Sequence, residues 1–242
     1  MKTIENLIVC GDSFQDFGEW PKYKGTHWSE IVADRLNVKL VNLAIKGGSS
    51  VAVAFQMLYA EQLPNSFVVG SLAASETRFE ISKQLDSSIL NTIENFIFEP
   101  TKKDPWNNKN NGIQHIRSTP LKDIDPLFRD QILTNFNLNL KRQTDIWSIL
   151  YALRRLSFNN IPFLFFQSVA KDKPIPLENF MPFVNEDSII KHDDFDLFAE
   201  IYDHDLMTLD EITRLDPGYH TTVERQTVIA DYMIERILKA LR

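Results

Sequence analysis

The sequence predicts an α/β protein, folded as a three-layer α/β/α sandwich with a central, mostly parallel sheet. Short apolar runs, typical of buried strands, alternate with longer segments whose apolar residues recur at helical spacing. Such alternation indicates parallel strands joined by helices that cover both faces of the sheet. A length of 242 residues suits one α/β domain. We therefore expect a single domain over 1–242, with insertions at about 99–126 and 171–210.

Each strand is predicted by a short apolar run that a turn or loop bounds. The expected strands are 7–10, 38–43, 66–70 and 162–166. The helices are predicted by apolar residues three or four positions apart, as at Trp28, Val32 and Leu36 in the first of them. The expected helices are 27–36, 51–62, 83–98, 127–158 and 222–241.

Two segments depart from this alternation. Residues 99–126 contain four of the 11 prolines and an Asn-rich run, which is typical of an exposed insertion. Residues 171–215 are acidic, contain prolines and are expected to be irregular, with one or two short helices. Because the first insertion follows the third strand and its helix, we expect it and residues 171–200 to wall a pocket.

Composition narrows the class of partner. The chain has 26 Lys and Arg against 33 Asp and Glu, a net charge of −7, which argues against nucleic-acid backbone and anionic membrane surfaces. No stretch reaches the roughly 20 apolar residues of a membrane span, and the N-terminus lacks the pattern of a signal peptide. The one cysteine, Cys10, is expected to be a buried, inert thiol. These features predict a soluble, cytoplasmic protein, although a virion component is also compatible with them.

Three turns contain residues that suit nucleophilic catalysis. The first, Gly11-Asp12-Ser13, follows the first strand, where a serine hydroxyl becomes a nucleophile if a base lies within reach. The second contains Gly47, where backbone N–H groups can face an oxyanion. The third, Asp216-Pro217-Gly218-Tyr219-His220, brings a carboxylate close to an imidazole. Each is also compatible with an ordinary turn or a helix cap.

Together, these blocks resemble the SGNH (GDSL-like) hydrolase family. Residues 11–18, Gly-Asp-Ser-Phe-Gln-Asp-Phe-Gly, look like its first block. Its second block is matched in spacing by Asn42, Ala44, Gly47 and Ser49. Its last block is an Asp-x-x-His with an apolar residue and an alanine nine and ten residues later, as Ile229 and Ala230 follow His220 here. Trp28 and the Arg78-x-Glu80 pattern are similar to phage-encoded members of the family.

This resemblance implies a serine hydrolase that needs no cofactor or metal. It implies Ser13 as nucleophile, His220 as general base and Asp216 as the group that orients His220. The backbone N–H groups of Ser13 and Gly47 would stabilise the oxyanion. Asp12 belongs to the first block beside the nucleophile, and with Gly47, Ser75 and Arg78 it is expected among the residues that bind the oxyanion or the substrate.

The chain departs from the family pattern at two points. The residue three positions before His220 is Pro217, so Asp216 stands one position further away than the family's Asp. The family's third block contributes an Asn to the oxyanion site, and no Asn follows the third strand here. Ser71, Ser75 or Thr77 would have to supply a hydroxyl in its place. Arg78 is interpreted either as a substrate-recognition residue or as half of an ion pair with Glu80.

The expected function is therefore hydrolysis of an ester, most specifically of an O-acetylated carbohydrate or another small-molecule ester. One alternative is an SGNH-fold binding or structural module that has lost catalysis, for example in a viral particle. Another is acyl transfer to a sugar by the same serine.

The remaining candidates are interpreted structurally. Asp203-His204-Asp205 and His192-Asp193-Asp194 contain metal-ligand types without the spacing of a zinc helix, so we interpret them as solvated loops. His27 is expected to cap a helix or to pack beside Trp28. His115 lies in the first insertion and has no predicted role.

Overall fold

A computed structural model of the chain describes residues 2–12, 15, 25–44, 48–72, 79–82, 113–116, 137–167, 180, 184–190 and 223–242. Within these residues the central sheet has four parallel strands in the order β2-β1-β3-β6. The strands are β1 (Asn6–Cys10), β2 (Lys39–Asn42), β3 (Ser66–Leu72) and β6 (Phe163–Gln167). The predicted parallel sheet is confirmed, and each predicted run forms its strand.

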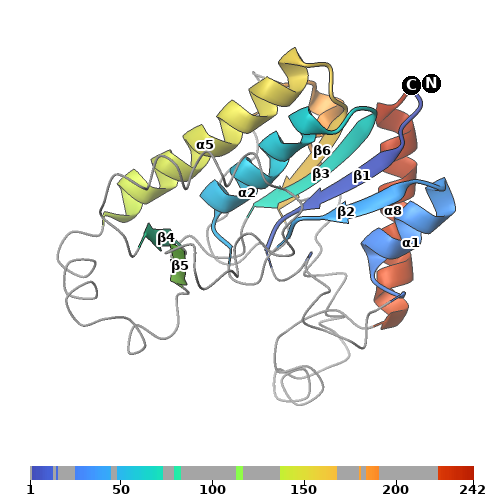
Figure 1. Cartoon of the computed structure of the whole chain (residues 1–242), viewed down its shortest axis with the longest axis horizontal. Coiled ribbons are helices and arrows are strands. Elements are labelled where there is room, and N and C mark those ends of the chain that lie inside the picture. Colours follow the sequence, from blue (N-terminus) through green and yellow to red (C-terminus); the bar gives the residue numbers. More distant parts are fainter. Residues whose placement is uncertain are drawn as a thin grey trace.

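Helices cover both faces of the sheet, so the predicted three-layer sandwich is confirmed (Figure 1). One face carries α1 (Trp28–Leu36) and α8 (Val223–Ala240); the other carries α2 (Ser50–Leu58) and α5 (Leu138–Phe158). A 3₁₀ turn, η2 (Tyr59–Gln62), continues α2. Strand side chains alternate between the two layers: Leu7 and Val9 pack towards α1 and α8, whereas Ile8 and Cys10 pack towards α2 and α5.

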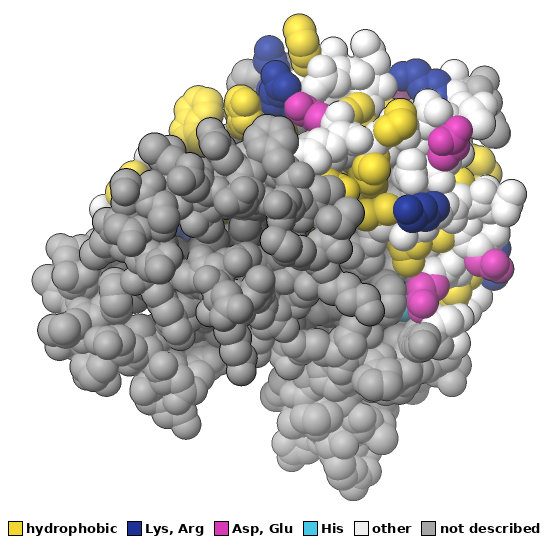
Figure 2. All heavy atoms as spheres, in the orientation of Figure 1, with side chains coloured by type: hydrophobic (Ala, Val, Ile, Leu, Met, Phe, Trp, Pro, Cys, Tyr) yellow, Lys and Arg dark blue, Asp and Glu magenta, His cyan; other side chains and the backbone are white. Residues whose placement is uncertain are grey.

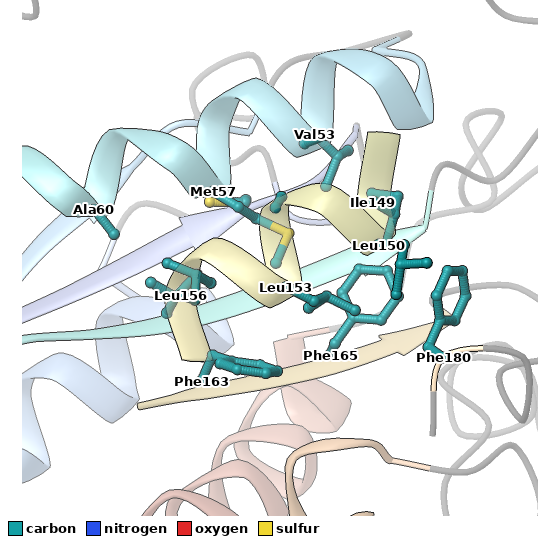
Figure 3. Packing of buried hydrophobic residues seen from close by; sticks show 14 of the residues in the cluster. Val53, Met57, Ala60, Ile149, Leu150, Leu153, Leu156, Phe163, Phe165 and Phe180 are labelled. Carbon is teal, nitrogen blue, oxygen red and sulfur yellow. The ribbon is translucent and has the colours of Figure 1, made fainter. Parts of the chain in front are cut away.

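The layer formed by α2 and α5 holds a dense apolar core (Figure 3). Met57 of α2 and Leu153 of α5 meet above Phe165 of β6, and all three are fully buried. Gly70 lets α2 approach the sheet closely, because a Cβ there would lie 2.8 Å from Met57 Sδ. Burial of both faces explains why β6 reads as a continuous apolar run rather than an alternating one.

The starts of three helices follow from local capping. His27 caps α1 through a capping box with Glu30, and its ring also lies 5.7 Å from the Trp28 ring, so both predicted roles of His27 are confirmed. The Ser49 side chain caps α2 by accepting from the Ala52 N–H. Asn137 caps α5 in the same way.

The predicted start of the long helix at residue 127 is wrong. Asn137 has an extended backbone, with φ −111° and ψ 106°, and its side chain accepts from the Leu140 N–H. A side-chain cap satisfies a free N–H only where the helix begins. The helix therefore begins at Leu138 and ends at Phe158.

The two predicted insertions contain some regular structure. In the first, β5 (Ile113–Ile116) pairs antiparallel with β4 (Phe79–Ser82), a two-stranded ladder that includes His115 and that sequence periodicity did not indicate. In the second, a 3₁₀ turn, η6 (Glu186–Ser188), leads to Ile189, which bridges to Phe165 beside β6. The predicted helix at 83–98 lies outside the described residues.

The two ends of the described chain meet on the amino-terminal side of the sheet. The Lys2 N–H donates to the Leu241 carbonyl at 3.1 Å, beside the start of β1 (Figure 1). Helix α8 therefore runs from the carboxyl edge of the sheet back to its amino edge. None of the helices in the described ranges is long and apolar enough to cross a membrane. A single domain over 1–242 remains a prediction.

Candidate active site at the carboxyl edge of the sheet

The residues that follow β1 and β2 lie at the carboxyl edge of the parallel sheet, where such folds place their sites. Hydrogen bonds tie the two loops together. The Asn42 Nδ2 group donates to the Gln15 carbonyl at 2.7 Å, and Asn42 Oδ1 accepts from the Ala44 N–H at 2.9 Å. One amide side chain thus holds the loop after β1 and shapes the loop after β2.

The loop after β1 is closed on itself as well. The Gln15 N–H donates to the Asp12 carbonyl at 3.1 Å. Asp12 and Gln15 are both fully buried and stand on either side of Ser13 and Phe14 in the chain. Two anchored residues therefore bracket the predicted nucleophile.

Gly11 follows β1 at a position where a side chain would crowd its neighbours. A Cβ at this residue would lie 2.5 Å from Gln15 Oε1 and 2.8 Å from Ser71 Oγ. The Gly11 N–H donates to Gln56 Oε1 of α2 at 2.7 Å, in the interior. Close packing therefore favours glycine at this position of the Gly-Asp-Ser motif, where the side chains of Gln15 and Gln56 both lie close to it.

Ser71, one of the three hydroxyls considered for the missing third-block Asn, lies inside β3. The strand extends two residues beyond its predicted end because Ser71 and Leu72 continue the pairing with β6. The Ser71 side chain is fully buried, and its Oγ has no hydrogen-bond partner in the described parts of the chain. It lies beside Gly11, because a Cβ at that glycine would be 2.8 Å from Ser71 Oγ. The other two candidates, Ser75 and Thr77, lie outside the described residues.

The start of α8 is fixed against the start of α1 at the same edge. The backbone N–H of Trp28 donates to Gln226 Oε1 at 2.7 Å, in the interior. Trp28 is the first residue of α1, where a backbone N–H has no acceptor within its own helix. Gln226 supplies that acceptor, and α8 begins three residues after His220.

Most of the predicted site residues lie outside the described residues. These are Ser13, Gly47, Ser75, Arg78, Asp216 and His220. Asp12 is described, and it is buried where β1 ends. The triad and the oxyanion site therefore remain predictions. The residues that flank them in the chain lie at the carboxyl edge of the sheet.

Sequence reasoning missed three buried amides, Gln15, Gln56 and Gln226. Glutamine is usually exposed, and Gln56 and Gln226 are buried because each accepts a backbone N–H from a distant part of the chain. Gln15 is held by its backbone instead, because its carbonyl accepts from Asn42 Nδ2. The predicted burial of Cys10 is confirmed, and burial raises the pKa of its thiol well above the usual range.

Among the described residues no three His, Cys, Asp or Glu side chains lie close enough together to form a metal site. The two acidic histidine motifs, 192–194 and 203–205, lie outside those residues.

The fold defines this protein as a three-layer α/β sandwich with a parallel sheet. No model of a known protein family and no curated protein matches its sequence. Among solved structures, it is similar to the psychrotrophic esterase EstA from Pseudoalteromonas sp., with 14% identity, a TM-score of 0.48 and 97% of each chain covered.

Two further solved structures show a likeness of the same order. A putative lipolytic protein of the G-D-S-L family from Desulfitobacterium hafniense DCB-2 has 12% identity and a TM-score of 0.43, with 96% of this chain and 98% of that chain covered. TesA has 13% identity and a TM-score of 0.45, with 98% of this chain and 100% of that chain covered. The resemblance to the SGNH family itself rests on the motifs at 11–18, 42–49 and 216–220.

Proposed function

We propose that this protein is a serine-dependent ester hydrolase with Ser13 as its nucleophile and His220 as its base. The observation that supports this proposal most is the hydrogen-bonded edge of the sheet. There, Asn42 ties the loop after β1 to the loop after β2, and Gln226 ties the start of α8 to α1. The chain neighbours of all three sequence motifs thus belong to one edge, although the first and the last, Gln15 and Gln226, are 211 positions apart in the sequence.

In the proposed reaction, Ser13 Oγ attacks the ester carbonyl while His220 accepts its proton. The resulting oxyanion is stabilised by the backbone N–H groups of Ser13 and Gly47. When the intermediate collapses, the bond to the alcohol breaks and His220 returns the proton to the leaving oxygen. Water then attacks the acyl-enzyme while His220 accepts a proton from it. The bond between the acyl carbon and Ser13 Oγ breaks, His220 returns the proton to Ser13 Oγ, and the acid is released. Asp216 orients the imidazole from beyond the turn at Pro217.

We infer an O-acetylated carbohydrate as the substrate class, on the basis of the family resemblance. In this proposal Arg78 binds polar groups of the substrate, and Ser75 donates its hydroxyl to the oxyanion in place of the family's Asn. Loss of a side-chain donor from an oxyanion site costs about 10²–10³ in kcat elsewhere. Replacing Ser75 with alanine should therefore lower kcat with less effect on KM.

Labelling by a fluorophosphonate probe tests the nucleophile, together with hydrolysis of p-nitrophenyl acetate. We expect wild-type protein to be labelled and Ser13→Ala to be unlabelled, with kcat reduced by up to about 10⁶. Ser157→Ala is the matched control, because Ser157 is an exposed serine in the last turn of α5, at the opposite end of the sheet. Equal labelling of wild type and Ser13→Ala refutes the proposal.

The same assay separates the two alternatives. A binding or structural module would show neither labelling nor turnover in the wild-type protein. An acyltransferase would be labelled at Ser13, would hydrolyse the ester slowly, and would consume it faster once a sugar acceptor is added. Hydrolysis that is rapid and insensitive to sugar supports the esterase.

A further inference from the structure

The outer face of α5 carries four large apolar side chains in solvent. Leu140, Trp147, Tyr151 and Phe158 are 62%, 68%, 59% and 78% exposed. Their spacings of seven, four and seven residues place them along one side of a helix. We call these four residues the α5 stripe. The opposite side of the helix is buried against α2 and the sheet, so the stripe contributes nothing to that core (Figure 3).

The α5 stripe forms a row rather than scattered exposed residues. Figure 2 shows hydrophobic side chains at the surface along the position that α5 occupies in Figure 1. Single exposed apolar residues are common on soluble proteins, whereas an extended apolar row marks an interaction site. The length of the helix, 21 residues or about 31 Å, sets the length of this surface.

The order of residues in the stripe indicates what covers it. Leu140 and Phe158 lie nine residues on either side of Ile149, and Trp147 and Tyr151 lie two residues on either side of it. A stripe with this symmetry is complementary to an antiparallel copy of itself. With a two-fold axis level with Ile149, Trp147 meets the partner's Tyr151, and Leu140 meets the partner's Phe158. Contacts of this reciprocal kind define a two-fold dimer interface.

The charges of α5 are compatible with this pairing. Lys141 and Arg155 are already paired within the chain, with Asp145 and Glu61. Arg154, which flanks the stripe, is five residues from the centre of symmetry. In an antiparallel pair the two copies of Arg154 are about 15 Å apart along the helix axis. That separation exceeds the Debye length of about 8 Å at physiological salt, so their repulsion is largely screened.

We propose that the α5 stripe is the interface of a homodimer in which two copies of α5 pack antiparallel. The size of the stripe indicates how strong this dimer is. Aromatic side chains bury about 150–250 Å² each, so covering the stripe on both copies removes on the order of 1,000 Å² from solvent. That is the low end for a specific interface, so monomer and dimer exchange with concentration. The dimer does not depend on the proposed esterase activity.

Sedimentation velocity over a range of protein concentrations tests the dimer. We expect the wild-type sedimentation coefficient to rise with concentration, and Trp147→Arg to stay monomeric throughout. Val228→Arg is the matched control: Val228 is 47% exposed on α8, outside the stripe, and its substitution should leave the dimer intact. A wild-type monomer at all concentrations, or a dimer that survives Trp147→Arg, overturns the proposal. Unchanged circular dichroism shows that the variants are folded.

Thiol crosslinking tests the antiparallel direction. Thr144 and Arg154 are exposed and symmetric about Ile149, so an antiparallel dimer brings each beside the other in its partner. With a short bis-maleimide, we expect the double variant Thr144→Cys/Arg154→Cys to crosslink between chains and Thr144→Cys alone to stay uncrosslinked. Cys10 is buried and stays unreactive. Crosslinking of Thr144→Cys alone indicates parallel helices and refutes the geometry.

Binding to phosphatidylcholine vesicles tests a membrane as the occupant of the stripe. If the protein never dimerises but binds these vesicles, and Trp147→Arg abolishes the binding, a membrane covers the stripe and the dimer proposal is refuted.

Discussion

The hydrogen bond between Gln226 and the backbone of Trp28 lets us predict how a substitution at Gln226 changes the free energy of unfolding. Gln226 is 2% exposed, and its Oε1 accepts the Trp28 N–H at 2.7 Å. The substitution Gln226→Met keeps the length of the side chain and removes the acceptor. It leaves a buried N–H at the first turn of α1 without a partner. Such an unsatisfied buried donor costs about 1–3 kcal/mol of the free energy of unfolding.

Urea unfolding followed by circular dichroism measures this cost. We expect the midpoint to fall with an unchanged m-value, and the melting temperature to drop by about 2–4 °C for each kcal/mol lost. Thr227→Met is the matched control, because Thr227 is the exposed neighbour on the same helix. Because α8 begins just after His220, the proposed function also predicts a lower kcat for Gln226→Met. An unchanged midpoint for Gln226→Met would show that the Trp28 N–H does not depend on Gln226.

Two further predictions concern other contacts of the described residues. Gly11→Ala should destabilise the protein by about 1–3 kcal/mol, because its Cβ would lie 2.5 Å from Gln15 Oε1. The double variant Gly11→Ala/Gln15→Ala should recover part of that loss in urea unfolding, and the lack of any recovery would contradict the steric explanation. The Lys239 ammonium, 2.8 Å from the exposed Asp187 carboxylate, lowers the pKa of that carboxyl. The pair therefore stabilises the fold above the unfolded-state pKa of Asp187, and this contribution disappears as the pH falls through the lower folded-state pKa. In Lys239→Ala, NMR titration should find the pKa of Asp187 raised, and an unchanged value would rule out Lys239 as the cause.

The sequence by itself determined the sheet and most of its helices. The strand at 163–166 can be predicted from sequence because a parallel strand that is buried on both faces is apolar at successive positions. The starts of α1 and α2 can also be predicted from sequence, since capping by His27 and Ser49 depends only on residues within one turn. The spacing of the three catalytic motifs is likewise a property of the sequence alone. These features share one physical cause, which is that short-range geometry fixes them.

Only the tertiary structure decided which polar side chains are buried. Gln56 and Gln226 read as surface residues, yet each is buried because its partner comes from 45 or 198 positions away. The same holds for Ser71, which sequence left open as a loop residue and which pairing with β6 draws into the strand. It also holds for the α5 stripe, since a helix with apolar residues on both sides does not reveal which side meets the core. Burial of a polar or apolar group depends on what packs against it, and in this protein distant segments supply that partner.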